Sequence, residues 1–115
     1  MIIYPQSENR QQLVQLGVFP SYNCGNMLTT IFRGRPQKNN QQGWNYDPYL
    51  QLQREGNLIY ARTSRDGKTW TDMPSSPVNA PQFEGKTLRV GIFQTTYSNN
   101  SAWVSFSDFK LWQKK

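Results

Sequence analysis

The stretch SRDGKTW, residues 64–70, combines the residues of a tight hairpin turn with a large aromatic side chain at its end. Asp66 and Gly67 form an Asp-Gly pair, which readily adopts the positive φ angles that such a turn needs. The side chains of Ser64 and Asp66 can hydrogen-bond to backbone N–H groups within the turn. We expect Trp70 to fold back as an apolar plug of the core. The motif therefore gives information about the fold and little information about chemistry.

Outward from this turn, apolar and polar residues alternate with a period of two, which is typical of β-strands. Strands are predicted at residues 11–19, 26–32, 49–54, 57–63, 87–97 and 102–112. Residues 33–47 are predicted to form a long polar loop, and a turn is predicted at Glu55-Gly56-Asn57. In the last strand the apolar positions change parity, which predicts a β-bulge near Ser107-Asp108.

The composition limits the possible classes of protein. A chain of 115 residues fits one domain, residues 1–115. Its net charge of +6 suits an anionic partner, but the positive residues are dispersed, so we interpret them as ordinary surface charge. A single cysteine, Cys24, excludes an internal disulfide, and its surroundings predict an inert thiol. No apolar run approaches the roughly 18 residues of a membrane helix, so no membrane partner is predicted.

Four motifs in order carry a resemblance to a known family. They are YLQLQREGN (49–57), SRDGKTW (64–70), LRVGIF (88–93) and VSFSDFKL (104–111). Together they resemble the C-terminal half of concanavalin A-like jelly-roll domains, the lectin-like and glucanase-like sandwiches. The most similar subgroup is often appended to bacterial glycosidases and other multidomain proteins. The resemblance covers residues 49–112, and residues 11–32 fit it loosely as an upstream strand pair.

The resemblance implies an all-β fold, an antiparallel β-sandwich of the jelly-roll type. A full jelly roll has about eight strands or more, whereas the predicted pattern leaves room for about seven. The resemblance therefore implies a shortened domain or a fragment of a longer protein. Either would leave a sheet edge or face uncovered, so we expect the chain to form a homo-oligomer through that edge or face.

The residues needed for catalysis are not clustered in the sequence. Glucanases of this fold use two carboxylates on one strand, whereas the seven carboxylates here are isolated from one another and histidine is absent. We therefore predict that the protein is not an enzyme and uses no cofactor. Four residues of the polar loop carry oxygens that could bind calcium, but loops of this kind usually bond to themselves and to water, so no metal site is predicted: Asn39, Asn40, Asn45 and Asp47.

Carbohydrate binding is the leading functional hypothesis. Sugars are held by aromatic rings and by planar polar side chains, and the alternation predicts such residues on an exposed sheet face and an adjoining loop. The predicted ligand-binding residues are Tyr60, Arg62, Arg89, Trp103, Gln51, Gln53, Trp44 and Tyr46.

The sequence is compatible with two other roles. The aromatic residues can be ordinary cross-strand partners, in a protein-interaction or structural accessory domain of a larger protein. Single-stranded nucleic acid is another possible partner, held by basic and aromatic residues of the polar loop. The basic and aromatic residues in question are Arg33, Arg35 and Lys38 with Trp44 and Tyr46. No RNA-binding motif accompanies them, so nucleic acid is the less favoured partner.

Overall fold

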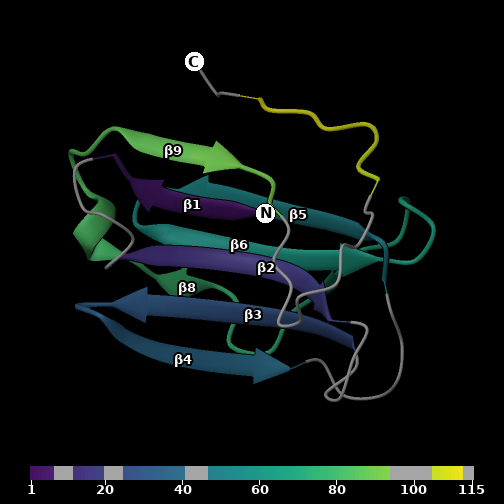
Figure 1. Cartoon of the computed structure of the whole chain (residues 1–115), viewed down its shortest axis with the longest axis horizontal. Helices are drawn as coiled ribbons and strands as arrows, with labels where there is room; N and C mark the ends of the chain where they lie inside the picture. Colours follow the sequence, from purple (N-terminus) through teal and green to yellow (C-terminus); the bar gives the residue numbers. More distant parts are fainter. Residues whose placement is uncertain (7–11, 20–24, 41–46, 94–104, 113–115) are drawn as a thin grey trace, which may run out of the picture.

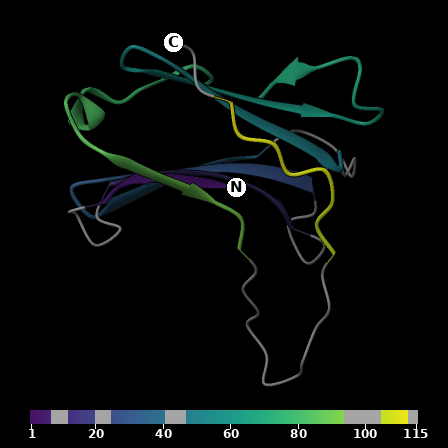
Figure 2. The same cartoon turned by 90° about the horizontal axis from the view of Figure 1, so that it is seen from above.

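The computed structural model describes residues 1–6, 12–19, 25–40, 47–93 and 105–112. Within these residues the chain forms nine β-strands and one short 3-10 helix, η1 (Pro81–Phe83). The strands make two antiparallel sheets that lie face to face (Figures 1 and 2). The predicted all-β antiparallel sandwich is therefore confirmed.

Five strands form the first sheet, in the order β4-β3-β2-β1-β9. Their bounds are β1 (Ile2–Pro5), β2 (Leu13–Phe19), β3 (Gly25–Phe32), β4 (Arg35–Asn40) and β9 (Leu88–Gly91). The second sheet runs β5-β6-β7, and β8 also pairs with β6. Its strands are β5 (Tyr49–Glu55), β6 (Leu58–Ser64), β7 (Thr71–Asp72) and β8 (Val78–Asn79).

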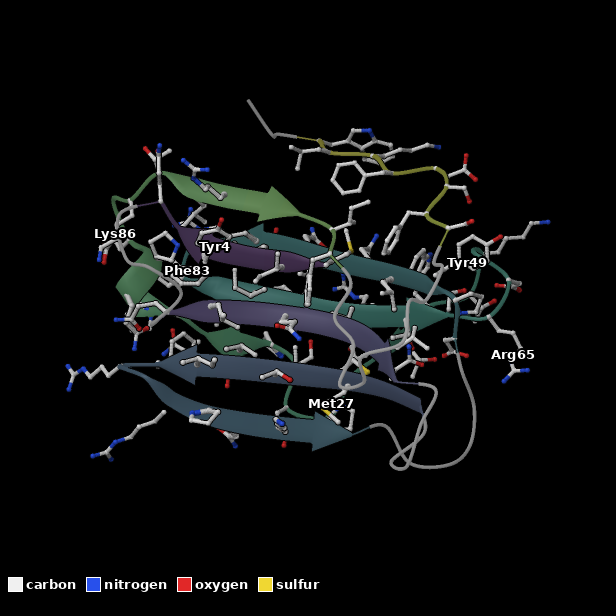
Figure 3. All side chains as sticks on the ribbon, in the orientation of Figure 1. Tyr4, Met27, Tyr49, Arg65, Phe83 and Lys86 are labelled. Carbon is white, nitrogen blue, oxygen red and sulfur yellow. The ribbon has the colours of Figure 1, made fainter. Side chains whose placement is uncertain are left out.

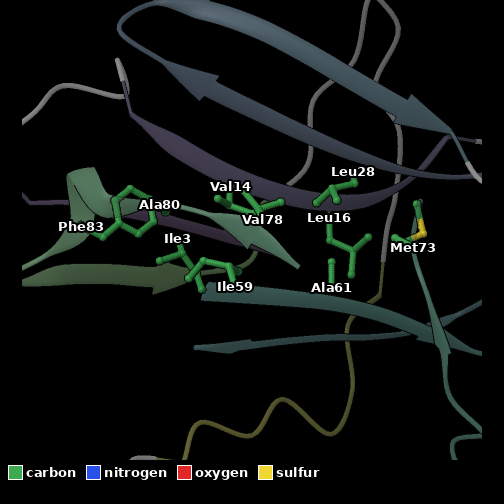
Figure 4. Close-up of a cluster of buried hydrophobic side chains, with 10 residues drawn as sticks. All are labelled: Ile3, Val14, Leu16, Leu28, Ile59, Ala61, Met73, Val78, Ala80 and Phe83. Atoms are coloured by element: carbon green, nitrogen blue, oxygen red, sulfur yellow. The ribbon is translucent and has the colours of Figure 1, made fainter. Parts of the chain in front are cut away.

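The core lies between the two sheets and follows from the alternation along each strand. In β6 the side chains of Ile59 and Ala61 are fully buried, whereas the intervening Tyr60 is only partly buried. Because successive side chains point to opposite faces of a strand, one face of each sheet supplies the core. Figure 4 shows the cluster, with Phe83 and Met73 at its two ends: Ile3, Val14, Leu16, Leu28, Ile59, Ala61, Met73, Val78, Ala80 and Phe83.

The predicted polar loop at residues 33–47 is wrong over its first part, where β4 pairs with β3. The two strands are joined by Arg33 and Gly34, with φ angles of 54° and 74°. Positive φ at both central residues is the conformation of a two-residue hairpin turn. Pro36 is compatible with a strand at this place, because proline is tolerated in an edge strand and β4 is the outermost strand of its sheet.

The predicted turn between β5 and β6 is confirmed. Glu55 pairs with Leu58, which leaves Gly56 and Asn57 as the loop, and Gly56 has a φ of 60°. Glycine at the first position of a two-residue loop accepts this angle without a steric cost. The predicted strands at 11–19, 26–32, 49–54 and 57–63 correspond to β2, β3, β5 and β6.

Four further expectations are corrected. The described residues contain nine strands where about seven are expected, partly because the sequence pattern does not reveal β1. The predicted strand at 87–97 ends at Gly91 within the described part, and 94–97 lie outside it. Residues 105–112, predicted as a closing strand, belong to neither sheet. Asp108, at the site of the predicted bulge, has a φ of 55°, but among the described residues no paired strand is present there to bulge.

One buried polar network joins the two sheets. Asn26 of β3 is only 1% exposed; its Nδ2 donates to the carbonyl oxygen of Asp47, and its Oδ1 accepts from the N–H of Asp47, both at 3.0 Å. The Asp47 carboxylate accepts a 2.8 Å hydrogen bond from Thr63 Oγ1 of β6. Asn26 in the first sheet is thus tied through Asp47 to the second sheet.

Replacing Asn26 with alanine should therefore be costly. The change removes both hydrogen bonds and leaves the buried backbone N–H and carbonyl of Asp47 without these partners. We expect Asn26→Ala to lower the free energy of unfolding by about 2–4 kcal/mol, measured by urea denaturation. The control is Asn79→Ala, because Asn79 is exposed on β8 and should change little. Equal stability of the two variants would contradict the role given to Asn26.

Candidate functional site

The outer face of the four-stranded sheet, the face turned away from the core, gathers most of the polar residues singled out in the sequence. The register places Gln51 opposite Arg62 and Gln53 opposite Tyr60 on β5 and β6. Asp72 of β7 lies opposite Arg62 on its other side. Side chains that are directly opposite one another in a sheet share a face and lie within contact distance. These five residues therefore form one surface cluster.

Arg62 is the centre of this cluster. Its Nε donates to Asp72 Oδ1 at 3.0 Å, and its Nη1 donates to Gln51 Oε1 at 3.2 Å and to Gln53 Oε1 at 2.7 Å. The guanidinium carbon lies 5.0 Å from the centre of the Tyr60 ring, a cation–π contact. The Arg62 side chain is 25% exposed and that of Asp72 is 62% exposed. The arginine is thus fixed by its neighbours and its charge is balanced by a carboxylate.

This arrangement determines what the cluster can offer a ligand. Both glutamine side chains use their oxygen toward Arg62, so their NH₂ groups are the parts that remain as donors to an incoming molecule. Asp72 keeps acceptor capacity, because a carboxylate can accept several hydrogen bonds. One face of the Tyr60 ring is covered by Arg62. The cluster therefore presents neutral donors and a carboxylate acceptor, while the arginine positions them.

The side chains of Ser64 and Asp66 make the predicted hydrogen bonds in the SRDGKTW turn, but the predicted tight hairpin is wrong, because six residues separate β6 from β7 and only Gly67 of the Asp-Gly pair has a positive φ. The N–H groups of Lys68 and Thr69 donate to Asp66 Oδ1 at 2.8 and 2.9 Å. Ser64 Oγ donates to the same oxygen and accepts from the N–H of Gly67 at 2.9 Å. The bonds from Thr69, then Lys68, then Ser64 lower the pKa of Asp66 below its ordinary value. Asp66 therefore acts as the organiser of the turn.

The same turn supports an exposed aromatic ring at one end of the outer face. A Cβ added to Gly67 would lie 3.1 Å from Cε1 of Tyr49, so the Tyr49 ring lies directly against the backbone of this glycine. Figure 3 shows Tyr49 at the same end of the sandwich as Arg65 of the turn. Tyr49 begins β5 and shares the outward parity of Gln51 and Gln53. The glycine thus provides the space in which this ring lies.

The expectation that Trp70 plugs the core is wrong, because the side chain is 36% exposed. The core position that follows β7 is filled by Met73, which is 2% exposed. Trp70 directly precedes Thr71, which pairs with Thr63, and Tyr49 pairs with the next residue, Ser64. The exposed Trp70 side chain therefore lies at the same end of the four-stranded sheet as Tyr49.

The structure brings together some of the predicted ligand-binding residues and separates another. Gln51, Gln53, Tyr60 and Arg62 share the cluster described above. Arg89 lies on β9, opposite Tyr4 in the five-stranded sheet, so it does not share their face. Trp44, Tyr46 and Trp103 lie outside the residues that the structure describes.

Asp72 joins this surface and Trp70 is exposed at the same end of the sheet as Tyr49, although the sequence gives neither of them a ligand-binding role. β7 spans only two residues, Thr71 and Asp72, and a strand so short shows no alternation to read. The turn motif that precedes β7 marks the position of Trp70 but does not show whether this side chain is buried or exposed. A longer strand would have shown an alternation of apolar and polar residues, from which inward and outward positions can be predicted.

The described residues also bear on three other chemistries. Asp47, a candidate calcium ligand, has Oδ2 bonded to Thr63 and Oδ1 3.8 Å from Arg65 Nε. No group of three His, Cys, Asp or Glu side chains suited to a metal ion occurs in this part of the chain. Arg35 and Lys38, candidates for nucleic-acid binding, are separated along the edge strand β4, three positions apart, and so point to opposite faces. The described segments include no helix with the length and hydropathy of a membrane span.

The chain matches no family model, no curated protein and no solved structure.

Gly67→Ala tests the contact between the turn and Tyr49. The new methyl group would meet the tyrosine ring, and φ at this position is +78°. We expect a loss of about 1–3 kcal/mol in the free energy of unfolding, measured by chemical denaturation. Gly85→Ala separates the two causes, since Gly85 has a φ of +69° but no atom within 4 Å of the added Cβ. It should lose less, and an equal loss in both variants would show that the ring contact is unimportant.

Acidification should weaken the turn through Asp66. Because the pKa of Asp66 is lowered in the folded state, its contribution to stability is complete above the pKa of an unfolded aspartate. The contribution is lost as the pH falls through the lower, folded-state pKa. Thermal melts at low salt between about pH 5 and about pH 3 should show a steeper fall in melting temperature for the wild type than for Asp66→Asn. Parallel curves would remove Asp66 as a source of acid sensitivity.

Proposed function

We propose that the protein is a non-catalytic binding module and that the outer face of its four-stranded sheet binds carbohydrate. The observation that carries the proposal is the cluster around Arg62, in which one fixed arginine orients the amides of Gln51 and Gln53 beside the carboxylate of Asp72. Sugar hydroxyls both donate and accept hydrogen bonds. A surface with amide donors and a carboxylate acceptor held in place is matched to them.

The exposed aromatic residues supply the second requirement of a sugar site. The C–H groups on one side of a pyranose ring make an apolar patch that packs on an aromatic ring. Tyr49 and Trp70 are 45% and 36% exposed and lie at the same end of the four-stranded sheet. A chain of sugar units lying along β5 and β6 would meet these rings at one end and the polar cluster further along.

The charge of the surface favours a neutral ligand over a phosphate backbone. Nucleic-acid sites depend on several cations that are free to neutralise phosphates. Here Arg62 is paired with Asp72 at 3.0 Å. The proposal of a carbohydrate-binding jelly-roll domain, similar to the concanavalin A-like modules, is consistent with the two-sheet sandwich and with this neutral polar surface.

Binding to a panel of plant, bacterial and algal polysaccharides tests the proposal. We expect retention on at least one immobilised polysaccharide, with quenching of tryptophan fluorescence as the solution readout. Trp70→Ala and Arg62→Ala should each weaken binding by about tenfold or more, which corresponds to roughly 1.4 kcal/mol. The first change removes an aromatic contact, and the second releases both glutamine amides.

Arg89→Ala is the matched control. Arg89 is also an exposed arginine on a strand, but it belongs to the five-stranded sheet. This variant should bind the polysaccharide as the wild type does. The proposal fails if the whole panel is silent, or if the two arginine variants lose affinity equally.

A further inference from the structure

Residues 105–112 leave large apolar side chains in water. Phe106, Phe109, Leu111 and Trp112 are 51%, 46%, 65% and 85% exposed. Such a concentration of exposed apolar side chains in eight residues is characteristic of an interaction surface. The segment belongs to neither sheet, so its backbone is also available for strand pairing.

The backbone of this segment is suited to present one apolar face. Phe106 lies at an even position and Phe109 and Leu111 at odd ones, so in a regular strand they would point to opposite sides. A φ of 55° at Asp108 interrupts the regular extended conformation between them. A strand with one extra residue at this point directs all three side chains to the same face.

The sandwich has one side on which its core is incompletely covered. Among the apolar residues packed against the core, five are only partly buried, and four of them lie on the edge strands β5 and β9: Leu50, Leu52, Leu88 and Val90. β5 and β9 are the outermost strands of their sheets on the same side of the molecule, and residues 105–112 are drawn on this side in both views (Figures 1 and 2).

β5 is the better match to the segment. It spans seven residues against four for β9, and segment 105–112 has eight. One edge of β5 pairs with β6, and no described strand pairs with the other. A strand added there with Phe109 and Leu111 inward would cover Leu50 and Leu52, which are half-buried now.

We propose that segment 105–112 of one copy adds to the free edge of β5 in a second copy, and that the exchange is reciprocal. The occupant is a second copy because, within its own chain, the segment lies on the correct side and yet its apolar side chains remain 46–85% exposed. Each copy carries both the free edge and the added strand, so a two-fold pair satisfies both at once. This inference does not depend on the ligand of the outer face.

Sedimentation of the purified chain over a range of concentrations tests the proposal. The wild type should be a dimer that dissociates on dilution. Leu111→Lys should raise the dissociation constant by about tenfold or more, because it places a charge among the inward side chains. Leu111 is already exposed in a single copy, so its replacement should leave the fold of that copy intact, as checked by circular dichroism.

Two further measurements complete the test. Gln37→Lys adds the same charge to an exposed position of β4, the opposite edge of the sandwich, and should dimerise as the wild type does. A synthetic peptide of residues 105–112, added in excess, should compete for β5 and convert dimer to monomer. A wild type that is monomeric at every concentration overturns the proposal, and so does a dimer that neither Leu111→Lys nor the peptide weakens.

Discussion

The sandwich depends on the hydrogen bonds between Asn26 and Asp47, because they link its two sheets. The groups involved are buried polar groups, which are costly to leave without a hydrogen-bond partner. A single amide side chain contacts both the N–H and the carbonyl of Asp47, as a neighbouring strand would. This fixes the backbone just before β5, so that Tyr49, two residues later, starts its strand at a defined place. The position of the exposed tyrosine on the outer face is thus determined in the interior.

The surface cluster around Arg62 is also held together by one side chain that makes several hydrogen bonds, but this side chain lies at the surface. Arg62 satisfies three oxygen acceptors and contacts one ring, so its long side chain is held in one conformation. The cost in side-chain entropy of ordering Arg62 is met in folding, which would favour binding of the proposed ligand without rearrangement of this side chain. The chain carries an overall charge of +6, yet at this cluster the local charge is balanced by Asp72.

The sequence predicts the parts of the fold that depend on local patterns, and less of what depends on pairing. Alternation identifies β5 and β6 and hence the outward residues Gln51, Gln53 and Tyr60. It cannot show that Arg89 joins the other sheet, because alternation gives the two faces of a strand but not its neighbours.

The remaining differences between expectation and structure have the same cause. Large aromatic residues are usually buried, which favours the core for Trp70, whereas its side chain is 36% exposed and Met73 fills the core position that follows β7. Pro36 is unfavourable in a central strand, which favours a loop, and only the pairing of β4 shows that it lies at an edge. For Trp70 the strand that follows, β7, is too short to be recognised, and for Pro36 the deciding pairing is made across the two-residue turn at Arg33 and Gly34.

The proline in β4 has a consequence for the size of any assembly. Pro36 has no N–H to offer a strand approaching the outer edge, and Lys38, two residues on, adds a positive charge to the same strand. Both features discourage a further strand from extending the five-stranded sheet at this end. Growth by edge pairing is therefore disfavoured at this edge of the five-stranded sheet, and the association proposed through β5 would close a pair without continuing through β4 into a fibre.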